Sequence, residues 1–108
     1  MPKQNEYGEY LDGNGYSNSF FDSEPYCIYC HTQSGKIDRH EIFHGPYRDK
    51  SKRYGCWCYL CHEHHMMLHC GELPELDIKL KTECQAMAMR YYGWNTDKFI
   101  SIFGKNYI

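Results

Sequence analysis

Residues 56–70 read CWCYLCHEHHMMLHC and place four cysteines and four histidines in one short stretch. Within it, Cys61-x-x-His64 has the spacing at which one tight turn aims two side chains at a single point. Cys27-x-x-Cys30 repeats this spacing upstream. Two such pairs supply the four ligands of a tetrahedral ion, and metal binding can contribute folding energy to a chain of this size. The sequence therefore predicts a structural zinc site formed by Cys27, Cys30, Cys61 and His64.

The remaining cysteines leave the membership of this site open. Cys58 can replace Cys61 or His64 as a ligand, and a set of buried free cysteines is the alternative to any metal site. The cysteines that we interpret as small buried hydrophobic side chains are Cys56, Cys58, Cys70 and Cys84. The total of seven cysteines is odd and no hydrophobic run resembles a signal peptide, so a disulfide framework is not expected.

Three further histidines predict a second metal site. His65 and His69 are four residues apart, so on a helix both imidazoles lie on one face. His40 lies in a segment with strand character, and a strand pair followed by this helix would bring it opposite them. Three histidine ligands leave coordination positions open, as in catalytic metal sites. The alternative is a set of unrelated surface and core histidines, and we expect His31 and His62 to be bystanders.

The acidic charge of the chain lies ahead of these motifs. Residues 1–26 carry one lysine and five acidic residues, a net charge of −4, whereas residues 27–70 carry six basic and four acidic residues, a net charge of +2. The first segment has no helical or strand period, and its regular apolar feature is Tyr7, Tyr10 and Tyr16. We expect either an acidic, tyrosine-rich arm that packs through its rings or a disordered tail. The length of 108 residues suits this arm and one domain over residues 27–108.

Periodicity and turn residues predict an α+β order of elements. Residues 36–43 and 56–60 favour strands, and we expect the polar, basic segment 46–54 to be a loop. Residues 61–70 can form a helix. Pro74 and Gly93 suit the two ends of a longer helix over 75–92. Thr96 can cap a last short helix that Gly104 closes. The long helix has one apolar stripe, formed by Leu76, Leu80, Cys84, Met87 and Tyr91.

Together these motifs resemble the phage-type HNH endonucleases. The resemblance covers about residues 27–108 and rests on Cys27-x-x-Cys30, Arg39-His40-Glu41-Ile42-Phe43, Leu60-Cys61-x-x-His64-His65, His69, Leu80-Lys81, Phe99-Ile100 and Phe103-Gly104-Lys105-Asn106-Tyr107. It implies a small α+β fold, a zinc-stapled ββα-metal unit with C-terminal helices. In this unit a β-hairpin and a helix hold one metal ion, and the cysteine pairs hold a separate zinc.

The resemblance also implies site residues for metal-assisted hydrolysis of phosphodiester bonds. The histidines that match the ligands of the second ion, which can be Mg²⁺, Mn²⁺, Ni²⁺ or Zn²⁺, are His40, His65 and His69. The basic residues that match the loop meeting DNA phosphates are Arg48, Lys50 and Arg53. The family places a general base after the first metal histidine, where this chain has Glu41, and His44 is the other base candidate. The central asparagine of the family has no counterpart, because no asparagine occurs from residue 19 to 94.

Three functions remain open from the sequence. The first is a metal-dependent DNA endonuclease. The second is a non-catalytic HNH-like zinc protein that binds another protein, for example an anti-CRISPR inhibitor that blocks DNA binding by a type II CRISPR effector nuclease. An acidic, tyrosine-rich arm suits a basic DNA channel. The third is a structural zinc module within a larger assembly. We expect a cytoplasmic location, the host cytoplasm if a phage encodes the chain, and no membrane segment.

Overall fold

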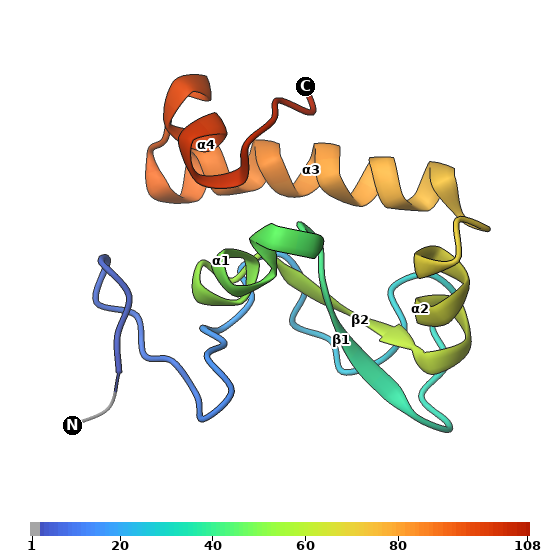
Figure 1. Cartoon of the computed structure of the whole chain (residues 1–108). Coiled ribbons are helices and arrows are strands. Elements are labelled where there is room, and N and C mark those ends of the chain that lie inside the picture. The colour runs from blue at the N-terminus through green and yellow to red at the C-terminus, as the bar shows by residue number, and fades with distance from the viewer. Residues whose placement is uncertain (1–2) are drawn as a thin grey trace.

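Two antiparallel strands form the centre of this computed structural model, which describes residues 3–108 (Figure 1). β1 (Ile37–Glu41) pairs with β2 (Trp57–Cys61), and in this register His40 lies opposite Cys58. The helices, in chain order, are α1 (Arg48–Arg53), α2 (His62–His69), α3 (Pro74–Tyr92) and α4 (Thr96–Phe103). This two-stranded sheet with four helices confirms the predicted small α+β class. Among residues 3–108, no helix combines the length and the apolar character needed to cross a membrane.

The segment between the strands is not the loop that we expected over 46–54. It forms a 3-10 turn over Gly45–Tyr47 and then the short helix α1. Ser51 explains this difference, because its buried hydroxyl accepts a hydrogen bond from the Phe43 backbone at 3.1 Å and donates one to the Cys56 carbonyl. These bonds tie α1 to the ends of both strands. The polarity of the segment does not reveal this tertiary contact.

The two C-terminal helices begin and end at residues with suitable local chemistry. Pro74 opens α3, and Gly93 ends it in the left-handed region at φ 71°, which glycine adopts without a steric penalty. The cap of α4 is Asn95, not Thr96, and its side-chain oxygen accepts a hydrogen bond from the Lys98 backbone at 2.8 Å. Asparagine ranks above threonine at this position, so the cap lies one residue earlier than expected.

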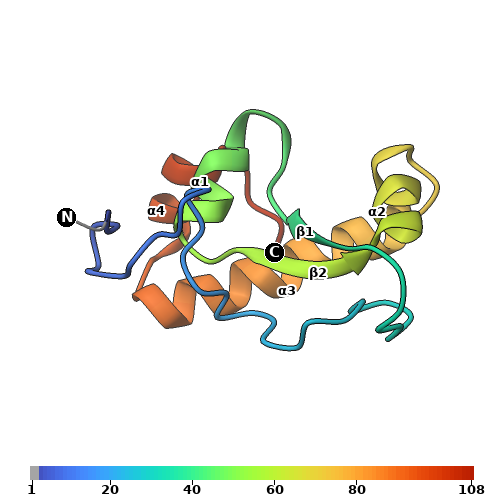
Figure 2. The ribbon, with the colours of Figure 1, turned by 90° about the horizontal axis from the view of Figure 1, so that it is seen from below.

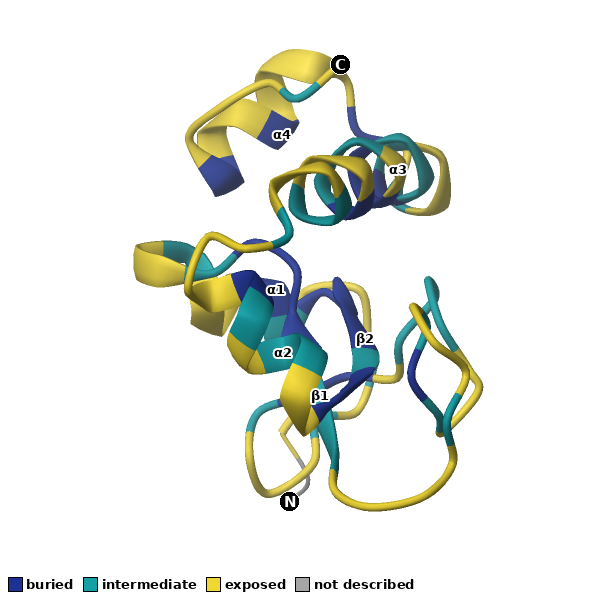
Figure 3. Cartoon of the chain, turned by 90° about the vertical axis from the view of Figure 1, so that its right-hand side faces the viewer, coloured by how far each residue is buried: buried dark blue, intermediate teal, exposed yellow. Residues whose placement is uncertain are grey.

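α3 lies across the hairpin and supplies one side of the core (Figures 1 and 3). Its buried side chains are Leu80, Cys84, Gln85 and Ala88. The predicted stripe is therefore right at Leu80 and Cys84 but wrong at its C-terminal end, where Tyr91 is 55% exposed. Gln85 and Ala88 are buried on this side instead, although neither belongs to the predicted apolar stripe. Of the cysteines expected in the core, Cys70 is instead exposed.

The N-terminal segment packs along the outer edge of β2 (Figure 2). The Ser19 hydroxyl donates to the Trp57 carbonyl at 2.6 Å, and the Tyr59 backbone donates to the Asp22 carboxylate at 3.0 Å. The Trp57 indole donates to the Ser17 carbonyl at 2.8 Å. These contacts cover an edge that would otherwise present unpaired backbone groups. Residues 3–26 are therefore an outer layer of the fold, and they are called the arm below.

Candidate metal centres

The ligand atoms of the two cysteine motifs converge where β2 passes into α2. One donor atom from each of Cys27, Cys30, Cys61 and His64 lies within 4.8 Å of all the others. The sulfur atoms of Cys30 and Cys61 are 3.9 Å apart, and Cys61 Sγ lies 3.1 Å from His64 Nδ1. Tetrahedral zinc with Zn–S bonds of about 2.3 Å places two sulfurs about 3.8 Å apart. This Cys3His group can therefore hold a metal ion such as zinc, and the fully buried Cys58 is not a member of it.

Local structure explains why these donors meet. Cys61 is the last residue of β2 and the N-cap of α2, so the strand-to-helix turn presents Cys61 and His64 together. The Ile28 backbone donates to the Tyr59 carbonyl at 2.8 Å and fixes the first cysteine turn beside β2. Burial raises the pKa of the Cys27 thiol, but hydrogen bonds from neighbouring backbone N–H groups outweigh it and lower the pKa to about 6. Cys27 is thereby biased toward the thiolate, the form that binds metals.

A second group that could hold a metal ion is formed by His40, His65 and His69, whose donor atoms also lie within 4.8 Å of one another. His65 and His69 are one turn apart on α2, with their Nε2 atoms 3.1 Å apart. The ring centre of His40, on β1, lies 5.1 Å from that of His65 and 5.4 Å from that of His69. The strand and the helix therefore hold three imidazoles around one point.

The His40 ring is fully buried, and neither of its nitrogens has a hydrogen-bond partner within residues 3–108. Leaving such a polar group unpaired in a protein interior is costly. Burial, together with the neighbouring His65 and His69, lowers the pKa of His40 to about 2. The ring is therefore neutral and offers a lone pair. A divalent ion would satisfy it, and three imidazoles are a suitable donor set for Zn²⁺, Ni²⁺ and similar ions.

Asp38 supports this group from outside, and the sequence analysis did not include it. Its Oδ2 atom accepts hydrogen bonds from Nδ1 of His65 at 2.9 Å and from Nδ1 of His62 at 2.8 Å. A carboxylate that binds the far nitrogen of a ligand histidine is typical of metal sites. His62, which we expected to be a bystander, belongs to neither ligand group, although it shares this carboxylate. The spacing of Asp38 and His40, two residues apart on one strand, was a signal for their common face.

The base candidate His44 lies beside the three-histidine group. Its ring centre is 5.1 Å from that of His69 and 5.8 Å from that of His40. Its Nε2 atom lies 3.2 Å from Oδ1 of Asp77 on α3. Because a carboxylate only accepts hydrogen bonds, this contact uses the N–H group at Nε2 and does not involve Nδ1.

The other base candidate, Glu41, has both carboxylate oxygens engaged. Oε2 accepts a hydrogen bond from the Tyr16 hydroxyl at 2.7 Å, and Oε1 is paired with the Arg48 guanidinium. The carboxylate is also buried, with 8% of its side chain exposed. Glu41 is therefore fixed between the arm and α1.

The basic residues expected to meet DNA phosphates all have partners within the chain. Arg48 is paired with Glu41, and Arg53 is paired with Glu6 of the arm. The Lys50 ammonium donates to the Ile102 carbonyl at 3.2 Å. Arg48 is nevertheless 60% exposed, so it remains accessible from solvent.

Comparison with known proteins adds no relative. No family model matches the chain, and no curated protein or solved structure is significantly similar to it. Function is therefore inferred from the geometry of the two ligand groups.

Proposed function

We propose that the chain is an HNH-like, metal-dependent DNA endonuclease whose ββα-metal unit consists of β1, β2 and α2. The observation that carries this proposal is the buried His40 ring, which has no hydrogen-bond partner among the described residues and lies beside His65 and His69. Three imidazoles around one ion leave coordination positions for water and a phosphate, whereas four Cys and His ligands close a site. The two groups therefore suit a catalytic ion and a structural zinc.

A divalent ion held by His40, His65 and His69 would stabilise negative charge on the scissile phosphate and on the leaving 3′ oxygen. The protein orients these ligands in two ways. Burial keeps the His40 ring neutral, and Asp38 holds the Nδ1 atom of His65 so that its Nε2 atom is directed toward His69. The ligands are thus set in place before an ion or a substrate binds.

Between the two base candidates, the geometry favours His44. Asp77 engages its Nε2 atom, which orients the ring and leaves Nδ1 to accept a proton from water. Glu41 is less suited, because Tyr16 and Arg48 already occupy both of its oxygens. Imidazole is also a stronger base than an unperturbed carboxylate. We therefore assign His44 as the general base and Glu41 as a link between the arm and α1.

A non-catalytic protein that binds another protein, such as an anti-CRISPR inhibitor of a type II CRISPR effector nuclease, is the second candidate. It is favoured by the intramolecular partners of Arg48, Lys50 and Arg53, which compete with DNA phosphates. Against it, two of the arm carboxylates that would reach a basic partner, Glu6 and Asp12, pair with arginines of the same chain.

A plasmid-nicking assay with Mg²⁺, Mn²⁺ or Ni²⁺ tests the proposal. We expect the wild type to nick supercoiled DNA and His69→Ala to lose this activity. His69 is an exposed ligand, so its replacement should leave the fold intact, as a thermal melt would verify. His31→Ala, an exposed histidine outside both ligand groups, is the matched control and should remain active. Nicking that persists in His69→Ala would indicate a contaminant, and inactivity of the wild type combined with a stable complex with an effector nuclease would favour the second candidate.

A further inference from the structure

A recess of about 480 Å³ opens beside the three-histidine group, and the arm and the domain line it together. The arm contributes Asn14 and Tyr16 to the lining of the recess, and α2 contributes His65. The basic side chains in its wall are Lys36, Arg39, Arg48 and Lys52. Of the three clustered histidines, His65 lines the recess, together with the acidic Asp38. The four basic side chains nevertheless make the recess a surface that suits a polyanion such as a DNA backbone.

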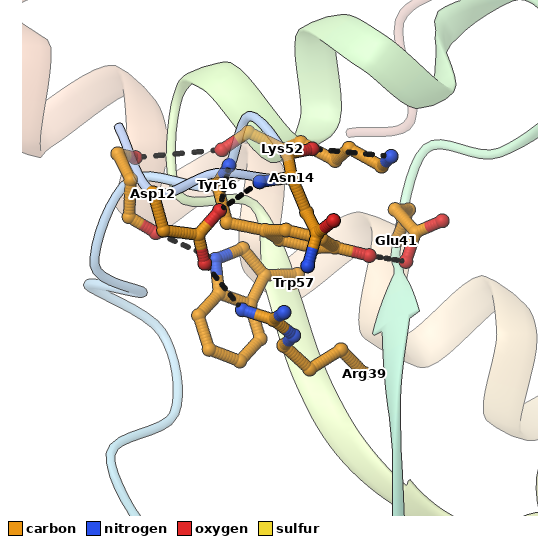
Figure 4. A network of polar contacts seen from close by, with 8 residues as sticks. Asp12, Asn14, Tyr16, Arg39, Glu41, Lys52 and Trp57 are labelled. Atoms are coloured by element: carbon orange, nitrogen blue, oxygen red, sulfur yellow. Dashed lines mark hydrogen bonds and ion pairs between the residues drawn. The ribbon is translucent and has the colours of Figure 1, made fainter. Parts of the chain in front are cut away.

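Arg39 is held in this wall by two residues of the arm (Figure 4). Its guanidinium carbon lies 3.9 Å from the centre of the Tyr16 ring, within cation–π distance. Its Nη1 atom donates to Oδ2 of Asp12 at 2.8 Å. Carboxylates and phosphates accept hydrogen bonds from guanidinium groups in the same manner. Asp12 therefore occupies a position on Arg39 that suits a phosphate oxygen.

The Asp12 carboxylate is itself oriented by the arm backbone. Its Oδ1 atom accepts hydrogen bonds from the backbone N–H groups of Asn14 at 2.8 Å and Tyr16 at 3.0 Å. Oδ2 is thereby turned to Arg39. The pair is accessible, because the Arg39 side chain is 31% exposed and that of Asp12 is 43% exposed. An exposed ion pair contributes little stability, so a polyanion can compete for Arg39.

The arm and the domain carry net charges of opposite sign. The whole chain has a net charge of −2 and residues 1–26 have −4, so residues 27–108 have +2. Besides the pair of Asp12 with Arg39, the arm forms a second ion pair with the domain, between Glu6 and Arg53. Two acidic side chains of the arm are therefore paired directly with arginines of the domain.

We infer that Asp12 acts as an internal stand-in for a DNA phosphate on Arg39, so that the arm weakens DNA binding in the recess until a DNA strand displaces this carboxylate. This inference rests on the proposed nuclease function and specifies how its site is regulated. The arm need not detach, since Ser17 and Ser19 hold it to Trp57 independently of Asp12. Only the Asp12–Arg39 contact has to open.

Asp12→Asn tests the inference with little disturbance of the fold. Asparagine keeps Oδ1 for the two backbone hydrogen bonds but replaces the oxygen that binds Arg39 with an amide nitrogen. Binding of a fluorescent duplex, measured by anisotropy at several salt concentrations without added divalent ion, should tighten about twofold to fivefold, the equivalent of one exposed ion pair. The slope of log affinity against log salt should steepen by about one unit, since one more arginine meets a phosphate. Glu24→Gln, an exposed change of the same charge in the same arm, should leave both quantities unchanged.

Arg39→Gln in the Asp12→Asn background should return the affinity to the wild-type value. Equal gains in Asp12→Asn and Glu24→Gln would overturn the inference in favour of a general charge effect, and so would an Asp12→Asn protein that binds DNA no better than the wild type. The nuclease proposal can fail separately. If Asp12→Asn binds DNA more tightly but no metal supports plasmid nicking, the nuclease proposal is contradicted and the role of Asp12 is supported. If the wild type nicks DNA but Asp12→Asn binds no more tightly, the role of Asp12 is contradicted and the nuclease proposal is supported.

Discussion

Oδ2 of Asp38 lies 2.9 Å from Nδ1 of His65, and this contact determines which nitrogen of His65 enters the three-histidine group. Because a carboxylate only accepts hydrogen bonds, His65 carries its proton on Nδ1. Its Nε2 atom then faces Nε2 of His69, 3.1 Å away. A pair of residues 27 positions apart thus orients an imidazole that could bind a metal ion.

Replacing Asp38 should therefore weaken the second metal site without unfolding the protein. Asparagine is isosteric but uncharged, so it accepts the hydrogen bonds from His62 and His65 more weakly, and such outer partners typically change metal affinity about 10-fold to 100-fold. Competition between the protein and a chromophoric chelator for Ni²⁺ or Zn²⁺ would measure the loss. Asp97→Asn, an exposed change in the first turn of α4, is the control. Equal affinities in the wild type and Asp38→Asn would show that the contact does not support a metal ligand.

The number of metal ions per chain separates the two ligand groups. We expect two ions in the wild type and one in His69→Ala, because the Cys3His group does not include His69. Mild chelation should remove the ion of the more open three-histidine group first. Elemental analysis of protein samples before and after dialysis against chelator provides the count. One ion in the wild type, unchanged in His69→Ala, would contradict a second site.

Cys30→Ala should unfold or aggregate the protein, since metal binding at the Cys3His group and folding are coupled. Cys70→Ala is a matched control, because Cys70 is exposed and belongs to neither ligand group. Thermal melts of the three proteins, recorded by circular dichroism, test this expectation. A melt of Cys30→Ala that coincides with the wild type would exclude a structural role for the ion.

Leu80 of α3 lies in the buried core that this helix shares with the hairpin. Leu80 is 4% exposed, so Leu80→Ala should lower the free energy of unfolding by about 2–5 kcal/mol. Ile78 lies on the same helix but is 49% exposed, and Ile78→Ala should cost less than about 0.5 kcal/mol. Urea denaturation of both variants gives the two values. Similar costs at the two positions would mean that α3 is not docked through this side.

The arm should loosen in acid. Burial raises the pKa of Glu9, but hydrogen bonds from Asn5, Tyr92 and Tyr91 outweigh it and leave the pKa below the ordinary value of a glutamate. A lowered pKa in the folded state means that the charged carboxylate stabilises the protein above about pH 4.5 and that this contribution is lost as the pH falls through the folded-state pKa.

Glu9→Gln should therefore be less stable than the wild type at pH 7, and the difference should shrink as the pH falls below 4.5. Urea denaturation between pH 7 and the lowest pH at which the wild type stays folded measures this difference. Acid also protonates the metal ligands, but it does so in both proteins, so the difference isolates Glu9. Glu24→Gln should show no such trend. A constant difference at all pH values would rule out the carboxylate as its source.

Short-range patterns in the sequence carried much of the architecture. Two x-x spacings predicted the pairs Cys27–Cys30 and Cys61–His64, because a tight turn brings such neighbours together in any fold that retains it. The tertiary structure brought the two pairs together and left Cys58 outside the group. The i, i+4 spacing likewise placed His65 and His69 on one face of α2, and Pro74 with Gly93 marked the ends of α3. The sequence predicted less well where propensity competes with packing, as in α1, whose Ser51 hydroxyl is used by both strand ends.

The sequence by itself determined most helices and strands and the types of the candidate metal ligands, since these depend on residues within one or two turns of each other. The tertiary structure decided the surroundings of the ligands. It placed Asp77 on His44, Tyr16 on Glu41 and Asp12 on Arg39, contacts between residues 25 to 33 positions apart. No period or spacing encodes such pairs. They arise because the arm covers the edge of β2 and α3 crosses the hairpin, and both follow from burying apolar surface and pairing exposed backbone groups across the whole chain.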